Sequence, residues 1–221
     1  MVGVSVANKR EWEATLNYYN KAKEECVSYP YGEYFVIDLF GEKIVFYRCG
    51  VRKTNSVGAN QYMIDRFKLD KVIVVGTCAG VDKKYNALDI VLPSKAVQYD
   101  CTVKEIEPLI RESFTVKLEN DCENNSCVIG TADKAVVMWK DYIELRDNNI
   151  TVADTEAAAI AYVCKVNNVR CVIVKGISDF PIEEIENNTN EAFDNQYETF
   201  IKNIPIIMNE IYSNYLGKLI K

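Results

Sequence analysis

The chain has 221 residues, of which 48% are hydrophobic and 26% charged, with a formal net charge of −6 at pH 7. This is the composition of a globular protein long enough to bury a sizeable core without disulfides or metal ions. The acidic balance argues against a nucleic-acid partner, because phosphate binding needs clustered Lys and Arg. We expect one domain, residues 1–221, without linkers or repeats.

The first apolar run, residues 2–7, is too short for a signal peptide, and its basic residues follow it instead of preceding it. It therefore predicts a first strand. Elsewhere no apolar run approaches the roughly 18 residues of a membrane helix. We expect no membrane contact and a cytoplasmic location.

Short apolar runs then alternate with helical patterns, which is typical of α/β proteins. Strands are predicted at 2–7, 33–39, 43–48, 71–76, 88–92, 127–131, 150–153 and 170–177. Helices are predicted at 9–25, 54–67, 134–146, 155–167 and 190–216. Pro205 lies inside the last helical pattern, which should kink or restart there. Residues 99–126 lack clear periodicity and are either functional or mobile.

The chain contains no histidine and eight cysteines. The lack of histidine excludes Ser-His-Asp and Cys-His nucleophilic sites and His-ligated zinc, so proton transfer falls to Asp, Glu, Lys, Tyr or Cys. The cysteines form no CxxC pair and are expected to be reduced, with a Cys122–Cys127 bridge as the alternative. Neither dinucleotide nor triphosphate motifs occur, and we expect no metal and no cofactor.

Three acidic residues, Glu11, Glu156 and Asp179, follow predicted strands. The carboxyl edge of an open α/β sheet is where small ligands bind, so all three could face one crevice. Each acid alone has a simpler explanation. Glu156 would be stabilised by the positive N-terminal end of a helix, and the N-cap of that helix would be Asp154 or Thr155. Glu11 could be an ordinary surface acid.

Small residues follow the buried run 71–76, where Gly76-Thr77-Cys78-Ala79-Gly80 predicts a turn. Such a turn lets backbone N–H groups approach a ligand closely, but it would serve equally well as a plain strand exit.

Four motifs occur in order along nearly the whole chain: GTCAGV at 76–81, LDIVLP at 88–93, EAAA at 156–159 and ISD at 177–179. Together they resemble the nucleoside phosphorylase and nucleosidase superfamily, and within it the methylthioadenosine/S-adenosylhomocysteine nucleosidases. The resemblance implies a three-layer α/β/α fold with a central mixed, twisted sheet. It also implies hydrolysis of the N-glycosidic bond of a purine nucleoside, such as a 5'-thio-substituted adenosine, and a homo-oligomer, most often a dimer.

The resemblance also implies residue roles. Asp179 would protonate N7 of the leaving base, and Ser178 would orient it. Glu156 would bind the ribose hydroxyls, and Glu11 would position or activate water at C1'. The remaining substrate-binding residues implied are Thr155, Thr77, Cys78, Ala79, Ala135, Val136 and Val51.

Two departures from the family pattern bear on the substrates. Val74 stands where one phosphorylase branch has an arginine, which favours water over phosphate, although Arg48 and Arg52 could supply charge. A phosphate-dependent purine nucleoside phosphorylase and a catalytically degenerate nucleoside-binding protein remain the alternatives. The Gly-Asp-x-Phe stretch, whose ring stacks on the base, is Ala-Asp-Lys-Ala at 132–135. The substitutes considered for that ring are Phe180, Trp139 and Tyr99.

Overall fold

The structure, a computed structural model, describes all residues except 101–111, 113, 119–125, 137–138 and 182–188. Within the described residues, eleven strands form one mixed sheet. They are β1 Val2–Val6, β2 Val27–Tyr29, β3 Gly32–Leu39, β4 Glu42–Arg48, β5 Lys71–Gly80, β6 Ile90–Val91, β7 Lys95–Gln98, β8 Thr115–Lys117, β9 Val128–Thr131, β10 Val152–Asp154 and β11 Arg170–Asp179.

The strand order is β2-β3-β4-β1-β5-β10-β9-β7-β8, and β11 pairs with β5 and β6. β1 is parallel to both β4 and β5, and β11 is parallel to β5 along nearly its whole length. β10 joins the end of β5 in the antiparallel sense and is parallel to β9. The sheet is therefore mixed, as the resemblance implied.

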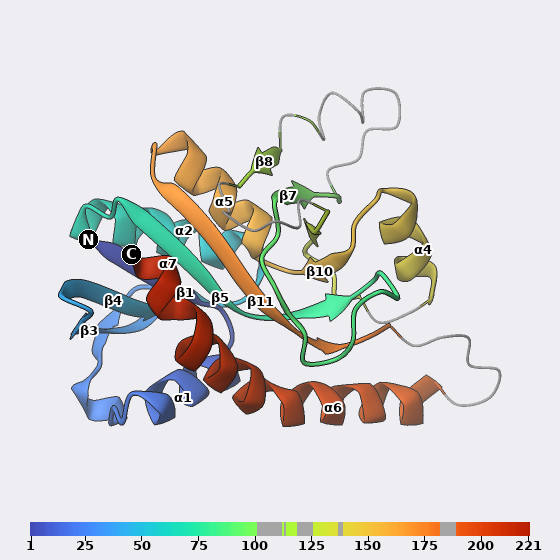
Figure 1. Ribbon diagram of the computed structural model, residues 1–221, viewed down its shortest axis with the longest axis horizontal. Helices are drawn as coiled ribbons and strands as arrows, with labels where there is room; N and C mark the ends of the chain where they lie inside the picture. The colour runs from blue at the N-terminus through green and yellow to red at the C-terminus, as the bar shows by residue number, and fades with distance from the viewer. Residues whose placement is uncertain (101–111, 113, 119–125, 137–138, 182–188) are drawn as a thin grey trace.

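Helices cover both faces of this sheet (Figure 1). The helical segments are α1 Lys9–Tyr18, η1 Lys23–Glu25, α2 Arg52–Phe67, α4 Trp139–Asp147, α5 Ala157–Val166, α6 Thr189–Glu210, η2 Ile211–Tyr215 and α7 Leu216–Ile220. One core cluster joins α2 and α5 to one face of the sheet through Met63 and Ile160. A second joins α1 and α6 to the other face through Trp12 and Ile207. The predicted three-layer α/β/α fold is confirmed.

Each predicted strand exists, but two of them continue further than predicted. β5 runs on to Gly80 and β11 to Asp179, so the predicted turn at residues 76–80 is wrong. The small residues continue as strand because β11 and β10 supply hydrogen-bonding partners on either side of them. Strands β2, β7 and β8 have no counterpart among the predictions.

The helix predictions need two corrections. The first helix ends at Tyr18 and is followed by the separate turn η1, because Asn20 takes a positive φ of 50°. The last helix does not restart at Pro205, which lies inside the continuous helix α6. A proline removes one N–H donor, and packing of the neighbouring Ile204 and Ile207 in the core maintains the helix there. Much of the aperiodic segment 99–126 lies outside the described residues.

Candidate active site

The sheet has a gap where β5 stops pairing with β1 and starts pairing with β10. β5 pairs with β1 as far as Val75 and with β10 at Ala79 and Gly80, while β11 lies along its other edge throughout. Between these two pairings one edge of β5 is uncovered, and Gly76 has a φ of +144° there. The ends of β1, β10 and β11 and the starts of α1 and α5 therefore meet around this opening.

A cavity of about 350 Å³ lies at this opening. All eleven residues that the sequence predicted for the site line it: Glu11, Val51, Thr77, Cys78, Ala79, Ala135, Val136, Thr155, Glu156, Ser178 and Asp179. They come from six separate stretches of the chain. Further lining residues are Ala7, Asn8, Ala153, Asp154, Gln196, Tyr197 and Phe200.

Glu11 is buried at the start of α1, with 2% of its surface exposed. Its Oε1 accepts hydrogen bonds from the backbone N–H of Thr77 at 2.7 Å and from the Thr77 hydroxyl at 2.8 Å. Its Oε2 accepts from the N–H of Asn8 at 3.1 Å and completes a capping box. Three donors thus fix the carboxylate, which excludes the surface-acid explanation for Glu11.

Asp154, and not Glu156, provides the carboxylate that caps α5. Its oxygens accept from the N–H of Ala157 at 3.1 Å and from the hydroxyl of Thr131 at 2.6 Å. Glu156 occupies the N-cap position, yet its side chain makes no capping bond. Its Oε1 instead accepts from the N–H of Arg52 at 2.8 Å and from the Thr155 hydroxyl. The side chain of Glu156 therefore does not cap the helix, and of the two expected capping residues it is Asp154, not Thr155, that makes the capping bonds.

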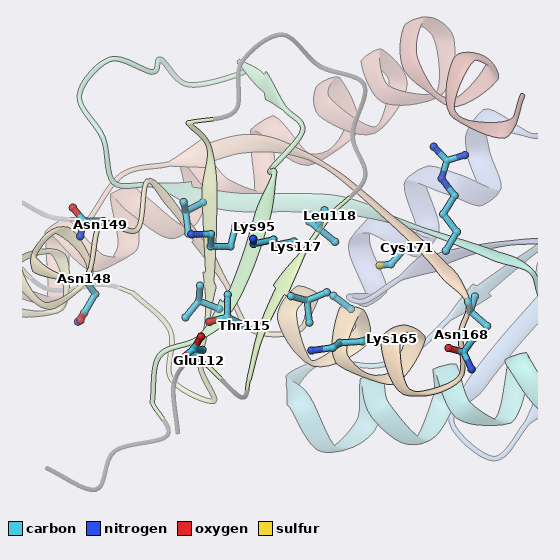
Figure 2. Close-up of a pocket in the computed structure, with 16 residues that line it drawn as sticks. Lys95, Glu112, Thr115, Lys117, Leu118, Asn148, Asn149, Lys165, Asn168 and Cys171 are labelled. Carbon is cyan, nitrogen blue, oxygen red and sulfur yellow. The ribbon is translucent and has the colours of Figure 1, made fainter. Parts of the chain in front are cut away.

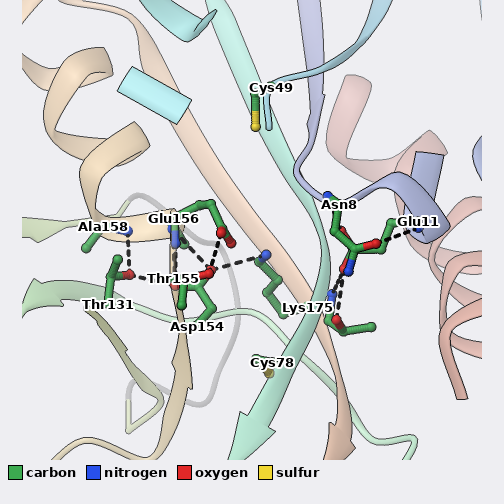
Figure 3. A network of polar contacts seen from close by, with 12 residues as sticks. Asn8, Glu11, Cys49, Cys78, Thr131, Asp154, Thr155, Glu156, Ala158 and Lys175 are labelled. Carbon is green, nitrogen blue, oxygen red and sulfur yellow. Dashed lines mark hydrogen bonds and ion pairs between the residues drawn. The ribbon is translucent and has the colours of Figure 1, made fainter. Parts of the chain in front are cut away.

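Burial raises the pKa of Glu156 to about 7, and the nearby Asp154 carboxylate adds to the shift. Lys175 on β11 acts in the opposite direction. Its Nζ lies 3.2 Å from Oδ2 of Asp154, and 1% of the Lys175 side chain is exposed (Figure 3). The hydrogen bonds from Thr155 and Arg52 also lower the pKa of Glu156. This carboxyl group is consequently poised to change its charge near neutral pH.

Asp179 ends β11 with a side chain that accepts two hydrogen bonds. The Ser178 hydroxyl donates to Oδ1, and Nε2 of Gln196 on α6 donates to Oδ2 at 2.9 Å. Burial raises the pKa of Asp179, while the bonds from Ser178 and Gln196 partly counteract that rise. Asn203 in turn donates to the Ser178 carbonyl at 2.7 Å. α6 therefore helps to position the acid.

Two of the three aromatic residues considered as substitutes for the missing stacking ring, Phe180 and Tyr99, do not line the pocket. Phe180 packs against Gly80, where an added Cβ would lie 2.3 Å from the ring, and Tyr99 belongs to a separate core cluster. The side chain of Trp139 lies outside the described residues. The aromatic side chains on the wall are Tyr197 and Phe200 of α6, whose ring centroids are 6.2 Å apart.

Sequence reasoning passed over Asp154 as a site residue and missed Lys175 and Gln196 altogether. Lys175 interrupts the otherwise apolar, buried run 171–177, and a lone charge in a buried strand is the signal that could have revealed it. Gln196 lies on the long amphipathic helix and has no comparable signal.

The two arginines considered for phosphate binding are held away from the pocket. The Arg48 guanidinium lies 4.0 Å from a carboxylate oxygen of Glu33, and that of Arg52 donates to the Asp133 carbonyl at 2.6 Å. Among the described residues that line the pocket, none is an arginine or a lysine. Nor do the described residues contain a cluster of three or more His, Cys, Asp or Glu arranged to hold a metal ion.

A larger groove of about 1040 Å³ lies on another part of the molecule, between β7, β8 and α5 (Figure 2). Lys95, Lys117 and Lys165 line it, but none of the eleven predicted site residues does. Its size therefore does not make it the candidate site, because the carboxylates and their donors are at the smaller cavity.

The fold and this carboxylate-lined pocket define the class of the protein. The model of the phosphorylase superfamily matches residues 2–212, and the chain belongs to that superfamily.

Two kinds of comparison give more particular likenesses. The 5'-methylthioadenosine/S-adenosylhomocysteine nucleosidase of Bacillus thuringiensis (strain Al Hakam) is 27% identical over 176 residues, which cover 71% of this chain and 74% of that protein. A mutant of the Helicobacter pylori nucleosidase with 5'-methylthioadenosine in its active site has a TM-score of 0.79 and 17% identity, with 96% of both chains covered. A futalosine hydrolase mutant from Helicobacter pylori strain 26695 matches equally well. At these identities the solved structures establish the fold.

In the part of the chain that the structure describes, no helix is both long and apolar enough to cross a bilayer.

Proposed function

We propose that this chain hydrolyses the N-glycosidic bond of a purine nucleoside, with 5'-methylthioadenosine and S-adenosylhomocysteine as substrates. One observation carries the proposal: Glu11, Glu156 and Asp179 line the same cavity, and each carboxylate has a different set of hydrogen-bond donors. The nucleosidases from Bacillus thuringiensis and Anoxybacillus flavithermus to which the chain is similar support the choice of substrates.

Asp179 is the general acid in this proposal. A purine leaves poorly as an anion, so protonation of its N7 lowers the barrier to departure. The raised pKa of Asp179, caused by burial, favours the protonated form that this step needs. Once the proton has moved to the base, the donors Ser178 and Gln196 stabilise the carboxylate left behind.

Glu156 binds the ribose. Its Oε1 is occupied by the N–H of Arg52 and the hydroxyl of Thr155, whereas Oε2 accepts no hydrogen bond from the described residues. Oε2 is therefore available to the 2' and 3' hydroxyl groups, which are donors well matched to a carboxylate. Because acceptance is strongest when Glu156 is ionised, substrate binding should weaken as Glu156 becomes protonated.

Glu11 positions and activates the attacking water. Its carboxylate is already oriented by Thr77, which donates twice to Oε1, and by Asn8, which donates once to Oε2, so Oε2 retains a lone pair for a water hydrogen. As the base departs, positive charge develops at C1', and a fixed negative carboxylate nearby stabilises it. Glu11 thus combines orientation of the nucleophile with electrostatic stabilisation.

Water is favoured over phosphate as the nucleophile because a phosphate dianion would need a cationic clamp. Arg48 and Arg52 are engaged with Glu33 and Asp133, and Lys175 is paired with Asp154. The described residues that line the pocket carry carboxylates and neutral side chains in place of such a cationic clamp.

The test is a product analysis. The purified chain is incubated with 5'-methylthioadenosine, S-adenosylhomocysteine, adenosine or inosine, each with and without phosphate, and the products are separated by chromatography. Free base and free sugar at a rate independent of phosphate are expected. Sugar 1-phosphate that forms only with phosphate would replace the hydrolase by a phosphorylase, and tight binding without cleavage would favour the degenerate binding protein.

We further propose that residues 1–221 form one domain, that the chain is a homodimer, and that it works in the cytoplasm, in methionine salvage. Six cysteines of the described residues are free thiols, which supports a reducing compartment, whereas Cys122 of the alternative bridge lies outside the described residues. Val57 on α2 and Val166 on α5 are large exposed apolar side chains on two helices that pack together, which supports an interface there. Light scattering coupled to size-exclusion chromatography would test the dimer.

A further inference from the structure

Lys175 is a fully buried ammonium group inside an apolar strand. At 1% exposure it is as buried as Val174 and Ile177 of the same strand. A buried ammonium is costly, and an apolar side chain of similar volume is often as stable or more stable at such a position. The packing of β11 therefore gives no reason for a lysine here, and its charge needs another explanation.

The surroundings of Lys175 are strongly acidic. Its Nζ lies 3.2 Å from Oδ2 of Asp154 on β10, in the space between Glu156 at the start of α5 and Glu11 of α1 (Figure 3). Two thiols, Cys49 after β4 and Cys78 on β5, also face this group. Burial raises the pKa of both thiols, so they are neutral near pH 7 and the charges are three carboxylates and one ammonium.

These carboxylates and the ammonium affect one another. Burial opposes a charge on Lys175, but attraction to Asp154, Glu11 and Glu156 outweighs it and raises the pKa of the ammonium. In the other direction, Asp154 raises the pKa of Glu156 while Lys175 lowers it. Carboxylates that share a small buried volume cannot all ionise unless a cation compensates them.

We propose that Lys175 is a positioning residue that keeps the Glu156 carboxylate ionised beside the pocket and holds Asp154 in place as the cap of α5. It acts through the neighbouring carboxylates and does not itself line the cavity. The part of the proposal that concerns substrate binding rests on the proposed function. The part that concerns the charge of Glu156 does not.

The test compares Lys175→Met, Asp154→Asn and the double variant with the wild-type chain. Asparagine is as good an N-cap as aspartate, so Asp154→Asn removes the charge and leaves a capping oxygen. The Glu156 titration is followed by NMR of ¹³C-labelled glutamate carboxyl groups and assigned with Glu156→Gln. This measurement needs no activity.

Lys175→Met should move the midpoint of the Glu156 titration upward by about one pH unit, the usual effect of losing an opposite charge. Asp154→Asn should move it downward, and the double variant should lie above Asp154→Asn. Lys165→Met, which removes an exposed lysine of α5, is the matched control and should leave the midpoint unchanged. If Lys175→Met does not fold, comparison of the double variant with Asp154→Asn isolates the lysine.

With substrate, KM should rise about fivefold at pH 7 in Lys175→Met, in proportion to the loss of ionised Glu156, with a smaller change in kcat, and Lys175→Arg should keep KM close to the wild-type value. An unmoved Glu156 midpoint in folded Lys175→Met would overturn the proposal. A shifted midpoint in a chain that cleaves no nucleoside would leave this proposal standing and reject the proposed function instead.

Discussion

The Glu11 carboxylate accepts both the backbone N–H and the hydroxyl hydrogen of Thr77, 66 residues further along the chain. The first bond reaches the uncovered edge of β5, between its pairing with β1 and its pairing with β10. A side-chain carboxylate thus occupies a position where a neighbouring strand would otherwise accept a hydrogen bond. The gap in the sheet and the orientation of the acid are therefore produced by the same contact.

Gly76→Ala should disturb that contact directly. Gly76 has a φ of +144°, and an added Cβ would lie 2.7 Å from Oε1 of Glu11. We expect a loss of about 1–3 kcal/mol in the free energy of unfolding and a large loss of turnover. Urea unfolding and product formation measure the two effects.

Gly41→Ala is the matched control for the glycine substitution. Gly41 also has a positive φ, of +84°, but an added Cβ would have no neighbour within 4 Å. It should lose stability without losing activity. If Gly76→Ala kept full activity, the position of the Glu11 carboxylate would not matter for turnover.

Asp179→Asn should nearly abolish turnover and leave binding largely intact. Asparagine has the same shape as aspartate and can still contact Ser178 and Gln196. Its amide, however, cannot donate an acidic proton to the base. A loss of about 10²–10⁴ in kcat is expected for removal of a general acid. Steady-state kinetics and calorimetric titration with substrate measure the two properties, with the exposed Asp38→Asn as control. Near-normal kcat would remove Asp179 from the mechanism.

The sequence could predict the site residues and the superfamily because both are recognised from the order of motifs along the chain. Apolar β-branched runs marked β5 and β11, and their ends placed Thr77 and Asp179 correctly at one crevice. The resemblance to the superfamily is confirmed by the match over residues 2–212. The roles assigned to the individual site residues stay predictions.

What the sequence could not reveal depends on contacts between distant segments. The continuation of β5 to Gly80 needs partners from β10 and β11, which no local pattern of residues 76–80 contains. The approach of Gln196 to Asp179 depends on how α6 crosses the sheet. Likewise, the choice of Asp154 over Thr155 as the side chain that caps α5 depends on Thr131, which is remote in sequence and donates to Asp154.

Gln196→Met should move the alkaline limb of the activity profile to higher pH. Burial raises the pKa of Asp179, and the bonds from Ser178 and Gln196 lower it. Removal of the Gln196 donor at 2.9 Å should therefore raise this pKa further and keep the acid protonated over a wider range. The dependence of kcat on pH measures the shift. A displacement to lower pH would show that Gln196 does not stabilise the ionised form.

Glu156→Gln should stabilise the folded chain at high pH. The pKa of Glu156 is about 7 in the folded state, against an ordinary value of 4.5. Below pH 4.5 the group is protonated in both the folded and the unfolded state, so its ionisation contributes nothing to the pH dependence. Between 4.5 and 7 the unfolded chain ionises first, and the free energy of unfolding falls as the pH rises.

Above pH 7 that loss is nearly complete and amounts to about 3 kcal/mol for a shift of this size. Glutamine cannot ionise, and its side-chain oxygen can still accept from the N–H of Arg52. The stability of Glu156→Gln relative to wild type should therefore increase by about that amount between pH 4.5 and pH 8. Urea unfolding at a series of pH values measures this difference, and the exposed Glu42→Gln should show almost none. A difference that stays constant with pH would mean that Glu156 ionises as easily in the folded chain as in the unfolded one. Glu156 would then bind the ribose as an ordinary ionised carboxylate, without charge compensation by its neighbours.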